Sequence, residues 1–205
     1  MAGMIGIFGG TFDPPHLGHL ILASFALDGL DLGEVRWVVT PRSPLKPAAA
    51  ISPPEVRARM VLTAIEAEPR FRLSRVDLDR PGPHFAADTL EKLAEAEPGT
   101  AFVYLLGSDS LEDLPRWKDP SRLLDRCAAL GVMRRPGAEP DLGRLERLVP
   151  GLSTKVRFFL APLVAISGHE IRARAAAGGG IRYLVPDSVL EIIRAESLYA
   201  GSPAE

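Results

Sequence analysis

Short apolar runs typical of strands alternate with helix-length runs along almost the whole chain. The expected strands lie at residues 4–8, 35–39, 71–74 with 76–78, 101–106, 128–133 and 156–160. The expected helices lie at residues 20–27, 54–66, 86–96, 111–114, 120–125, 142–148, 167–177 and 188–197. This alternation predicts βαβ units, and therefore an α/β fold with a doubly wound, mostly parallel sheet and helices on both faces.

Sheets of this kind bind ligands beyond the carboxyl ends of their strands. We therefore expect the loops after Phe8, Val39, Leu106 and Met133 to share one edge and to carry the functional residues. The chain has 205 residues, of which 46% are hydrophobic. This suits a single domain over residues 1–205, in which residues 165–200 form a small C-terminal helical subdomain.

Charge and cysteine content narrow the class of protein. The formal net charge of -2 argues against a nucleic-acid partner, although a local basic pocket for one polyphosphate is compatible with it. The single cysteine, Cys127, lies in an apolar run and is typical of a small core residue. There is no basic segment followed by an apolar leader, and no apolar run of bilayer length. We expect a soluble cytoplasmic protein without a membrane partner.

Residues 9–19, with the sequence GGTFDPPHLGH, follow the first expected strand. Glycines at a strand end let backbone N–H groups approach an anion, and the start of the next helix favours negative charge in the same place. His16 and His19 are three residues apart, so a helix that has begun by then places both imidazoles on one side. A simpler interpretation is that both histidines merely cap the helix. The glycine spacing differs from the dinucleotide-binding fingerprint, which disfavours a dehydrogenase.

The same segment resembles the signature of the nucleotidyltransferases that share the T/HxGH motif. The resemblance implies a Rossmann-like fold and transfer of a nucleotidyl group from ATP. It also implies that His16 and His19 are catalytic, because the two histidines of that superfamily bind the ATP phosphates and stabilise the pentavalent α-phosphorus. The other residues of the segment implied to bind ATP are Gly9, Gly10, Thr11, Phe12 and Gly18.

Later segments, from Met4 to about Tyr199 in all, resemble the bacterial nicotinate-nucleotide adenylyltransferases. Residues 42–47 (RSPLKP) resemble the family's lysine-bearing run, which implies that Lys46 reaches both the reacting phosphates and the nicotinate mononucleotide. Leu45 stands where the family usually has histidine. Residues 131–137 (GVMRRPG) resemble the family's strand exit, which implies that Arg135 binds ATP.

Two further segments of the resemblance concern the acceptor, and one of them also contains residues for ATP. Residues 80–90 (RPGPHFAADTL) imply that backbone N–H groups at Phe85 and Ala86 receive the nicotinate carboxylate, a role that does not depend on side-chain identity. Residues 106–118 imply that Gly107 and Asp109 bind ATP and that Trp117, with Lys118 beside it, binds the nicotinate ring. Polar neighbours of Trp117 favour a surface cleft over a core position.

Residues 165–172 (AISGHEIR) resemble a phosphate-binding helix start of the same family. Ser167 and Glu170 have the spacing of a capping box, which any helix can use. The resemblance implies that Ser167 and Arg172 bind the β- and γ-phosphates, and that Arg172 is catalytic as a planar cation with several donors. Gly168 and His169 replace the family's Ser-Thr pair. His169 is either a substitute donor to ATP or a surface residue.

The predicted reaction joins ATP and nicotinate mononucleotide, with Mg²⁺ bound mainly through the ATP phosphates and without dedicated protein ligands. One alternative is a related transferase that acts on nicotinamide mononucleotide or phosphopantetheine. Another alternative is a nucleotide-binding regulator that has lost catalysis. The sequence leaves a homo-oligomer open.

Overall fold

The sheet is the centre of the computed structural model, which describes residues 3–42, 52–134 and 140–201. Its strands are β1 (Met4–Gly10), β2 (Leu32–Val39), β3 (Phe71–Ser74), β4 (Phe102–Gly107), β5 (Ala129–Arg134) and β6 (Val156–Leu160). They pair in the order β3-β2-β1-β4-β5-β6, and every pairing is parallel. The chain moves outward from β1 in both directions, so the prediction of a doubly wound parallel sheet is confirmed.

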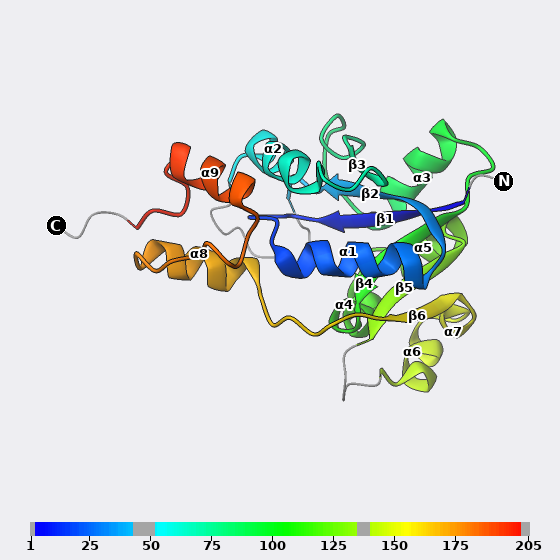
Figure 1. The fold of residues 1–205 in the computed structure, drawn as a ribbon. Helices are drawn as coiled ribbons and strands as arrows, with labels where there is room; N and C mark the ends of the chain where they lie inside the picture. The colour runs from blue at the N-terminus through cyan, green and yellow to red at the C-terminus, as the bar shows by residue number, and fades with distance from the viewer. Residues whose placement is uncertain (1–2, 43–51, 135–139, 202–205) are drawn as a thin grey trace.

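Helices cover both faces of the sheet (Figure 1). They are α1 (Leu17–Gly29), α2 (Pro54–Ile65), α3 (Ala86–Ala96), α4 (Ser108–Asp113), α5 (Pro120–Arg126), α6 (Leu142–Leu148), α7 (Leu152–Lys155), α8 (Gly168–Ala176), α9 (Asp187–Ala195) and the 3₁₀ helix η1 (Leu114–Arg116). The four-residue α7 was not predicted, because one turn of helix shows no periodicity. The segment 76–78 is a turn rather than part of a strand, since the Asp79 N–H returns to the Arg75 carbonyl.

Three apolar clusters hold the layers together. One joins the sheet to α3 and α5 and is centred on Ile7, Leu90 and Leu130. A second joins the other face to α1 and α2 around the buried indole of Trp37. The third packs Ile171 of α8 and the apolar side of α9 against α2, so the C-terminal helices lie on the second layer.

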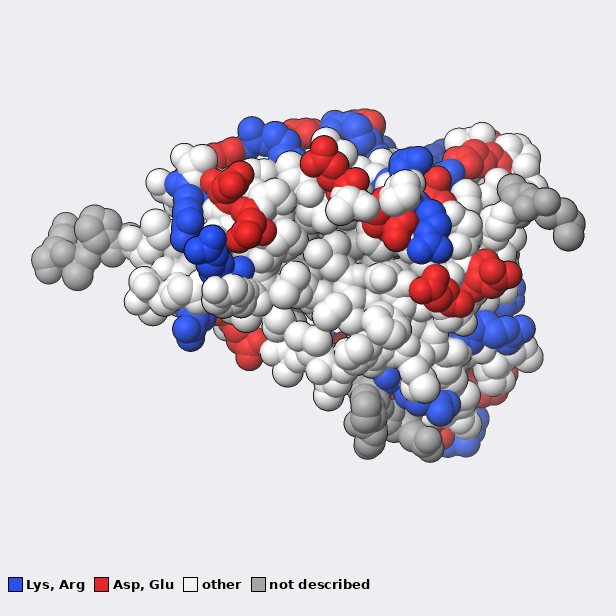
Figure 2. All heavy atoms as spheres, viewed as in Figure 1, with Lys and Arg blue, Asp and Glu red and all other residues white. Residues whose placement is uncertain are grey.

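The outer face of α1 has little charge, because Asp28 is the one charged residue of the helix. Figure 2 shows an uncharged area in the middle of this face, with the charged side chains around its rim. In the described part of the chain, no helix combines the length and the apolar character that crossing a membrane requires.

Candidate active site

A cavity of about 800 Å³ opens at the carboxyl edge of the sheet. It lies among the ends of β1 and β4 and the first turns of α1, α3 and α4. Twelve of the residues predicted for the site line it: Gly9, Gly10, Thr11, His16, Gly18, His19, Phe85, Ala86, Gly107, Asp109, Trp117 and Lys118. The structure therefore brings three separate sequence segments to one place.

His16 and His19 form a stacked pair at the start of α1. Their ring centroids are 3.6 Å apart, with an angle of 27° between the planes. The backbone N–H of His16, the N-cap residue, donates to Nδ1 of His19 over 3.2 Å. Because Nδ1 of His19 accepts this bond, the neutral ring carries its proton on Nε2. His19 therefore does cap the helix, through its Nδ1.

The imidazole of His16 is deeply buried, with 6% of its surface exposed. Burial lowers its pKa to about 4, so the ring is neutral near pH 7. Its Nδ1 has no hydrogen-bond partner among the described residues. A Cβ atom at Gly18 would lie 3.2 Å from this ring, so glycine gives the imidazole room beside α1. A buried ring nitrogen without a protein partner, on a cavity wall at a helix start, suits an anionic ligand.

Arg57 of α2 holds the loops around the histidine pair, and sequence analysis did not find it. Its side chain is fully buried and donates to the carbonyl oxygens of Thr11, Thr40, Pro41 and Ser52. These four carbonyls come from the loops after β1 and β2 and from the approach to α2. Burial lowers the pKa of the guanidinium. No local pattern in α2 distinguishes Arg57 from its neighbours, because its partners are distant in sequence.

Asp13 connects the same loop to the C-terminal helices. Its buried carboxylate accepts hydrogen bonds from the Tyr199 hydroxyl over 2.6 Å and from the Ser52 N–H over 3.2 Å. Its carbonyl accepts from Nη1 of Arg172 over 2.7 Å. Arg172 therefore lies beside the loop of residues 9–19 but is not part of the cavity wall.

The first turn of α8 has the predicted capping box. The Glu170 N–H donates to Oγ of Ser167 over 3.2 Å, and the Ser167 N–H donates to the Glu170 carboxylate over 3.1 Å. His169 is exposed, and neither it nor Ser167 lines the cavity. A Cβ atom at Gly168 would lie 3.0 Å from the Asp13 carbonyl oxygen. Glycine at this position thus permits the close approach of α8 to the Asp13 loop.

Three more predicted site residues, Phe12, Lys46 and Arg135, are not among the residues that line the cavity. The side chain of Phe12 is buried among Phe8 and Trp37, and its backbone has a φ of 48°. Its ring is therefore a core group, and only its backbone is available to a ligand. Lys46 and Arg135 lie outside the described residues.

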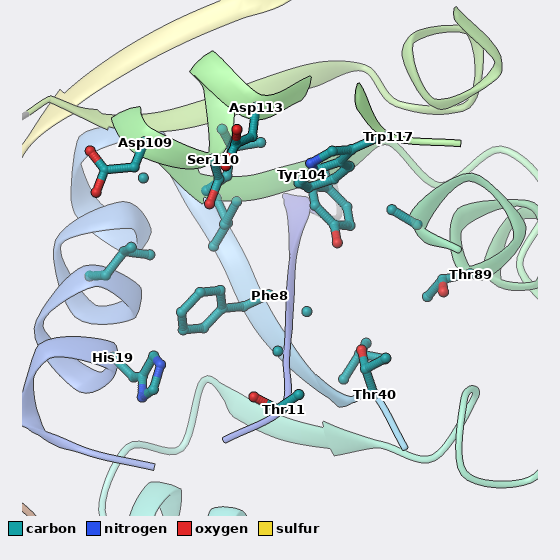
Figure 3. A pocket seen from close by; sticks show the side chains of 18 of the residues that line it. Phe8, Thr11, His19, Thr40, Thr89, Tyr104, Asp109, Ser110, Asp113 and Trp117 are labelled. Atoms are coloured by element: carbon teal, nitrogen blue, oxygen red, sulfur yellow. The ribbon is translucent and has the colours of Figure 1, made fainter. Parts of the chain in front are cut away.

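Trp117 and Tyr104 form the aromatic side of the cavity. Their rings meet edge to face, with centroids 6.0 Å apart and an interplanar angle of 82°. Figure 3 shows both rings on one side of the pocket, with Thr11 and His19 on another. Trp117 is partly buried and lines the cavity, as its polar sequence neighbours predicted. Tyr104 was not predicted, because in sequence it is one apolar position of a buried strand.

A buried polar cluster lies beneath this aromatic side, next to the start of α3. The Thr89 hydroxyl donates to Oδ1 of Asp77 over 2.8 Å, and Arg80 donates to the same oxygen with Nε and Nη2. Thr89 and Asp77 are buried, and both line the cavity. The cluster ties the loop before α3 to the helix itself, which fixes the backbone N–H groups of Phe85 and Ala86. Sequence analysis missed it because its members are up to 12 residues apart.

A deep cavity at the carboxyl edge of a doubly wound sheet, with glycine backbone, a helix start and two imidazoles at one end, defines a nucleotide-binding α/β protein. The model of the cytidylyltransferase-like family matches residues 7–174. A probable nicotinate-nucleotide adenylyltransferase of Thermomicrobium roseum is 41% identical over 95% of this chain and 91% of its own. Another, of Roseiflexus castenholzii, is 39% identical over 97% and 98% of the two chains. This chain belongs to the cytidylyltransferase-like family and, within it, to the nicotinate-nucleotide adenylyltransferases.

Solved structures agree on the fold. The nicotinic acid mononucleotide adenylyltransferase of Plasmodium falciparum in complex with NaAD has a TM-score of 0.78 to this chain, with 20% identity. The match covers 96% of this chain and 97% of that one. The same protein in complex with APC has a TM-score of 0.76.

Proposed function

We propose that this chain joins ATP and nicotinate mononucleotide to give nicotinic acid adenine dinucleotide and pyrophosphate. The observation that carries the proposal is the stacked His16–His19 pair, which shares one cavity with Trp117 and the start of α3. The two histidines suit a triphosphate. Trp117, together with the start of α3, suits a flat ring that carries a carboxylate. Relatives that bear this activity in their names are about 40% identical over nearly their whole length, which supports the same acceptor.

The reaction in this proposal is an in-line displacement. An oxygen of the mononucleotide 5′-phosphate forms a bond to the α-phosphorus of ATP, while the bond from that phosphorus to the β-phosphate oxygen breaks and its electron pair leaves with pyrophosphate. A phosphate monoester is already an anionic nucleophile near neutral pH, so no covalent enzyme intermediate is needed. The protein contributes position and charge neutralisation.

Each residue has a part in that scheme. His19 donates from Nε2, and His16 donates from its buried ring, to oxygens of the α- and β-phosphates. The backbone of Gly9, Gly10 and Phe12, with the Thr11 hydroxyl, supports the incoming phosphate. Further groups proposed to contact ATP or to offset charge on the leaving pyrophosphate are Gly18, Lys46, Gly107, Asp109, Arg135, Ser167, His169 and Arg172.

Arg172 has a particular requirement in this scheme. Its Nη1 is bonded to the Asp13 carbonyl, so it reaches a phosphate only by turning from that carbonyl or by using another of its five donors. The same side chain can then tie α8 to the loop of residues 9–19 in the presence of the nucleotide.

Mg²⁺ belongs to the proposal as an ion held mainly by the ATP phosphates and by water. When bound, the ion would lower the repulsion between the triphosphate and the attacking phosphate. Asp77, Asp109 and Asp113 are the described carboxylates of the cavity wall; Asp77 is bonded to Arg80 and Thr89, and Asp113 is bonded to Arg116. Among the described residues, no three His, Cys, Asp or Glu side chains gather where they would hold a metal ion. The proposal also includes a cytoplasmic location and no nucleic-acid partner.

The test is a steady-state assay of pyrophosphate release with ATP, Mg²⁺ and one acceptor at a time. We expect nicotinate mononucleotide to give a kcat/KM at least tenfold above nicotinamide mononucleotide, and phosphopantetheine to give no product. A preference for either of the other acceptors would replace the proposed substrate. Binding of ATP without pyrophosphate release from any acceptor would support a regulator instead.

A further inference from the structure

Tyr104 has a hydroxyl group that the proposed reaction does not yet use. The residue is in the interior strand β4, between β1 and β5, and only 8% of its surface is exposed. Even so, it lines the cavity, and Figure 3 shows its hydroxyl directed into the pocket and away from Trp117. The small exposed part of this side chain therefore faces the site.

No hydrogen bond to this hydroxyl is found among the described residues. The Tyr104 ring packs in the core cluster and against Trp117, and the Asp77 carboxylate lies near enough to influence it. A polar group that faces a cavity and has no protein partner bonds to water or to a ligand that displaces the water. A Tyr side chain in an interior strand that leaves its hydroxyl unpaired points to a ligand as the partner. Burial, together with the nearby Asp77 carboxylate, raises the pKa of the phenol. The group is therefore protonated near neutral pH and can donate.

The position of the hydroxyl decides which part of the ligand it meets. A Cβ atom at Gly9 would lie 2.7 Å from the Tyr104 oxygen, so the hydroxyl lies directly over the Gly9 backbone. The ring of Tyr104 contacts Trp117. In the proposed function, Trp117 takes the nicotinate ring and Gly9 with Gly10 supports the 5′-phosphate. The ribose is what connects these two groups in a pyridine mononucleotide.

We infer that the Tyr104 hydroxyl binds the ribose of the acceptor mononucleotide by donating a hydrogen bond to one of its hydroxyl oxygens. This inference rests on the proposed function and deepens it. An uncharged donor suits a neutral sugar oxygen, whereas the charged groups of the acceptor already have the helix starts of α1 and α3. Tyr104 is then a substrate-binding residue that contacts the acceptor and not ATP.

The test is Tyr104→Phe, which removes one oxygen and keeps the ring against Trp117. We expect the KM for nicotinate mononucleotide to rise about fivefold to tenfold, while the KM for ATP and kcat stay within about twofold. The Tm should not fall, because the hydroxyl has no protein partner to lose. The matched control is Tyr183→Phe, since Tyr183 is 84% exposed and lies outside the cavity wall.

Acceptor analogues provide the second measurement. Nicotinate mononucleotides that lack the 2′- or the 3′-hydroxyl should lose affinity with the wild-type protein, and one of them should show no further loss with Tyr104→Phe. An unchanged acceptor KM in the variant would overturn the inference. Equal rises in both KM values with a lower Tm would also overturn it, since they would indicate a structural role.

Failure of the proposed function would look different. If the wild-type protein releases no pyrophosphate with nicotinate mononucleotide, the reaction is wrong, and calorimetric titration of that mononucleotide still compares wild type with Tyr104→Phe. Weaker binding by the variant alone would support the ribose contact without the reaction. Equal binding, or none by either protein, would overturn it.

Discussion

The two ends of the cavity are built in different ways. The end with His16 and His19 consists of backbone, glycine and two imidazoles, and it is held from behind by Arg57 and Asp13. The end with Trp117 combines aromatic side chains from separate elements with the backbone at the start of α3, and it is backed by a buried cluster around Asp77. We refer to them as the phosphate end and the acceptor end.

This difference reflects the two kinds of ligand group. A triphosphate carries the same charge in every nucleotide, so contiguous backbone N–H groups and a helix start recognise it without regard to the base or the acceptor. An acceptor must be distinguished from similar molecules, which requires several side chains at defined positions. Changes at the phosphate end should therefore affect turnover, and changes at the acceptor end should affect the choice and affinity of one substrate.

The largest expected effect is that of His19→Ala at the phosphate end. Loss of one positioned donor to the phosphates should lower kcat by about 10²–10³-fold, while circular dichroism stays native and Tm falls only by the contribution of one helix cap. Ser24→Ala, on the exposed side of the same helix, is the control and should keep full activity. Near-normal turnover in His19→Ala would contradict both the proposed reaction and the role of the phosphate end.

Arg57→Met tests the support behind the phosphate end. It leaves four carbonyl groups without their donor, so the free energy of unfolding should fall by about 2–4 kcal/mol. Urea denaturation followed by circular dichroism measures this change. Arg59→Met is the matched control two residues away. Its exposed ion pair with Glu196 should contribute less than about 1 kcal/mol. Equal losses of unfolding free energy in Arg57→Met and Arg59→Met would show that the buried contacts stabilise the fold no more than the exposed ion pair does.

Thr89→Val tests the support behind the acceptor end. The change keeps the shape of the side chain but removes the hydrogen bond to Asp77. The loop before α3 should loosen, and the KM for nicotinate mononucleotide should rise about tenfold, equivalent to about 1.4 kcal/mol, with the KM for ATP unchanged. Thr63→Val removes a comparable hydroxyl bond within α2, to the Met60 carbonyl, and should leave both KM values unchanged. A rise in the KM for ATP in Thr89→Val would contradict the functional division between the two ends of the cavity.

The same difference explains what could be predicted from the sequence. The parallel sheet and the phosphate end follow from contiguous patterns, namely alternating runs and the segment of residues 9–19. Arg57, Tyr104 and the Asp77 cluster depend on contacts between distant segments, and their residue types are unremarkable in sequence. The start of α1 was predicted at Leu20 but lies at Leu17, because the N-cap is His16 and not one of the Ser, Thr, Asp or Asn residues that usually mark a helix start.

Gly168 shows a further limit of sequence patterns. In the resemblance, Gly168 stands where the family has the first residue of a Ser-Thr pair. The structure adds a packing reason, since a Cβ atom there would crowd the Asp13 carbonyl. That contact joins residues more than 150 positions apart in the chain, and no local motif contains it.

The smallest expected effect concerns the protonation of His16. The unfolded chain takes up a proton at this imidazole below about pH 6.5, and the folded protein does so only near pH 4. The free energy of unfolding should therefore fall as the pH is lowered through this interval. A bound triphosphate places negative charge beside the ring, which favours the protonated form and should raise the pKa of His16 by about one unit or more.

Nitrogen-resolved NMR titration of the imidazoles, with and without a non-hydrolysable ATP analogue, measures this shift. Because the nucleotide prefers the protonated ring, its affinity should increase as the pH falls toward the pKa of the complex. Nicotinate mononucleotide alone should raise the pKa of His16 by less than the ATP analogue does, since only its single 5′-phosphate reaches the phosphate end while its ring and ribose occupy the acceptor end. An equal rise in the pKa of His16 with the mononucleotide would mean that a ligand at either end changes the potential at His16. The two ends would then differ in the groups that they bind but not in their electrostatic effect.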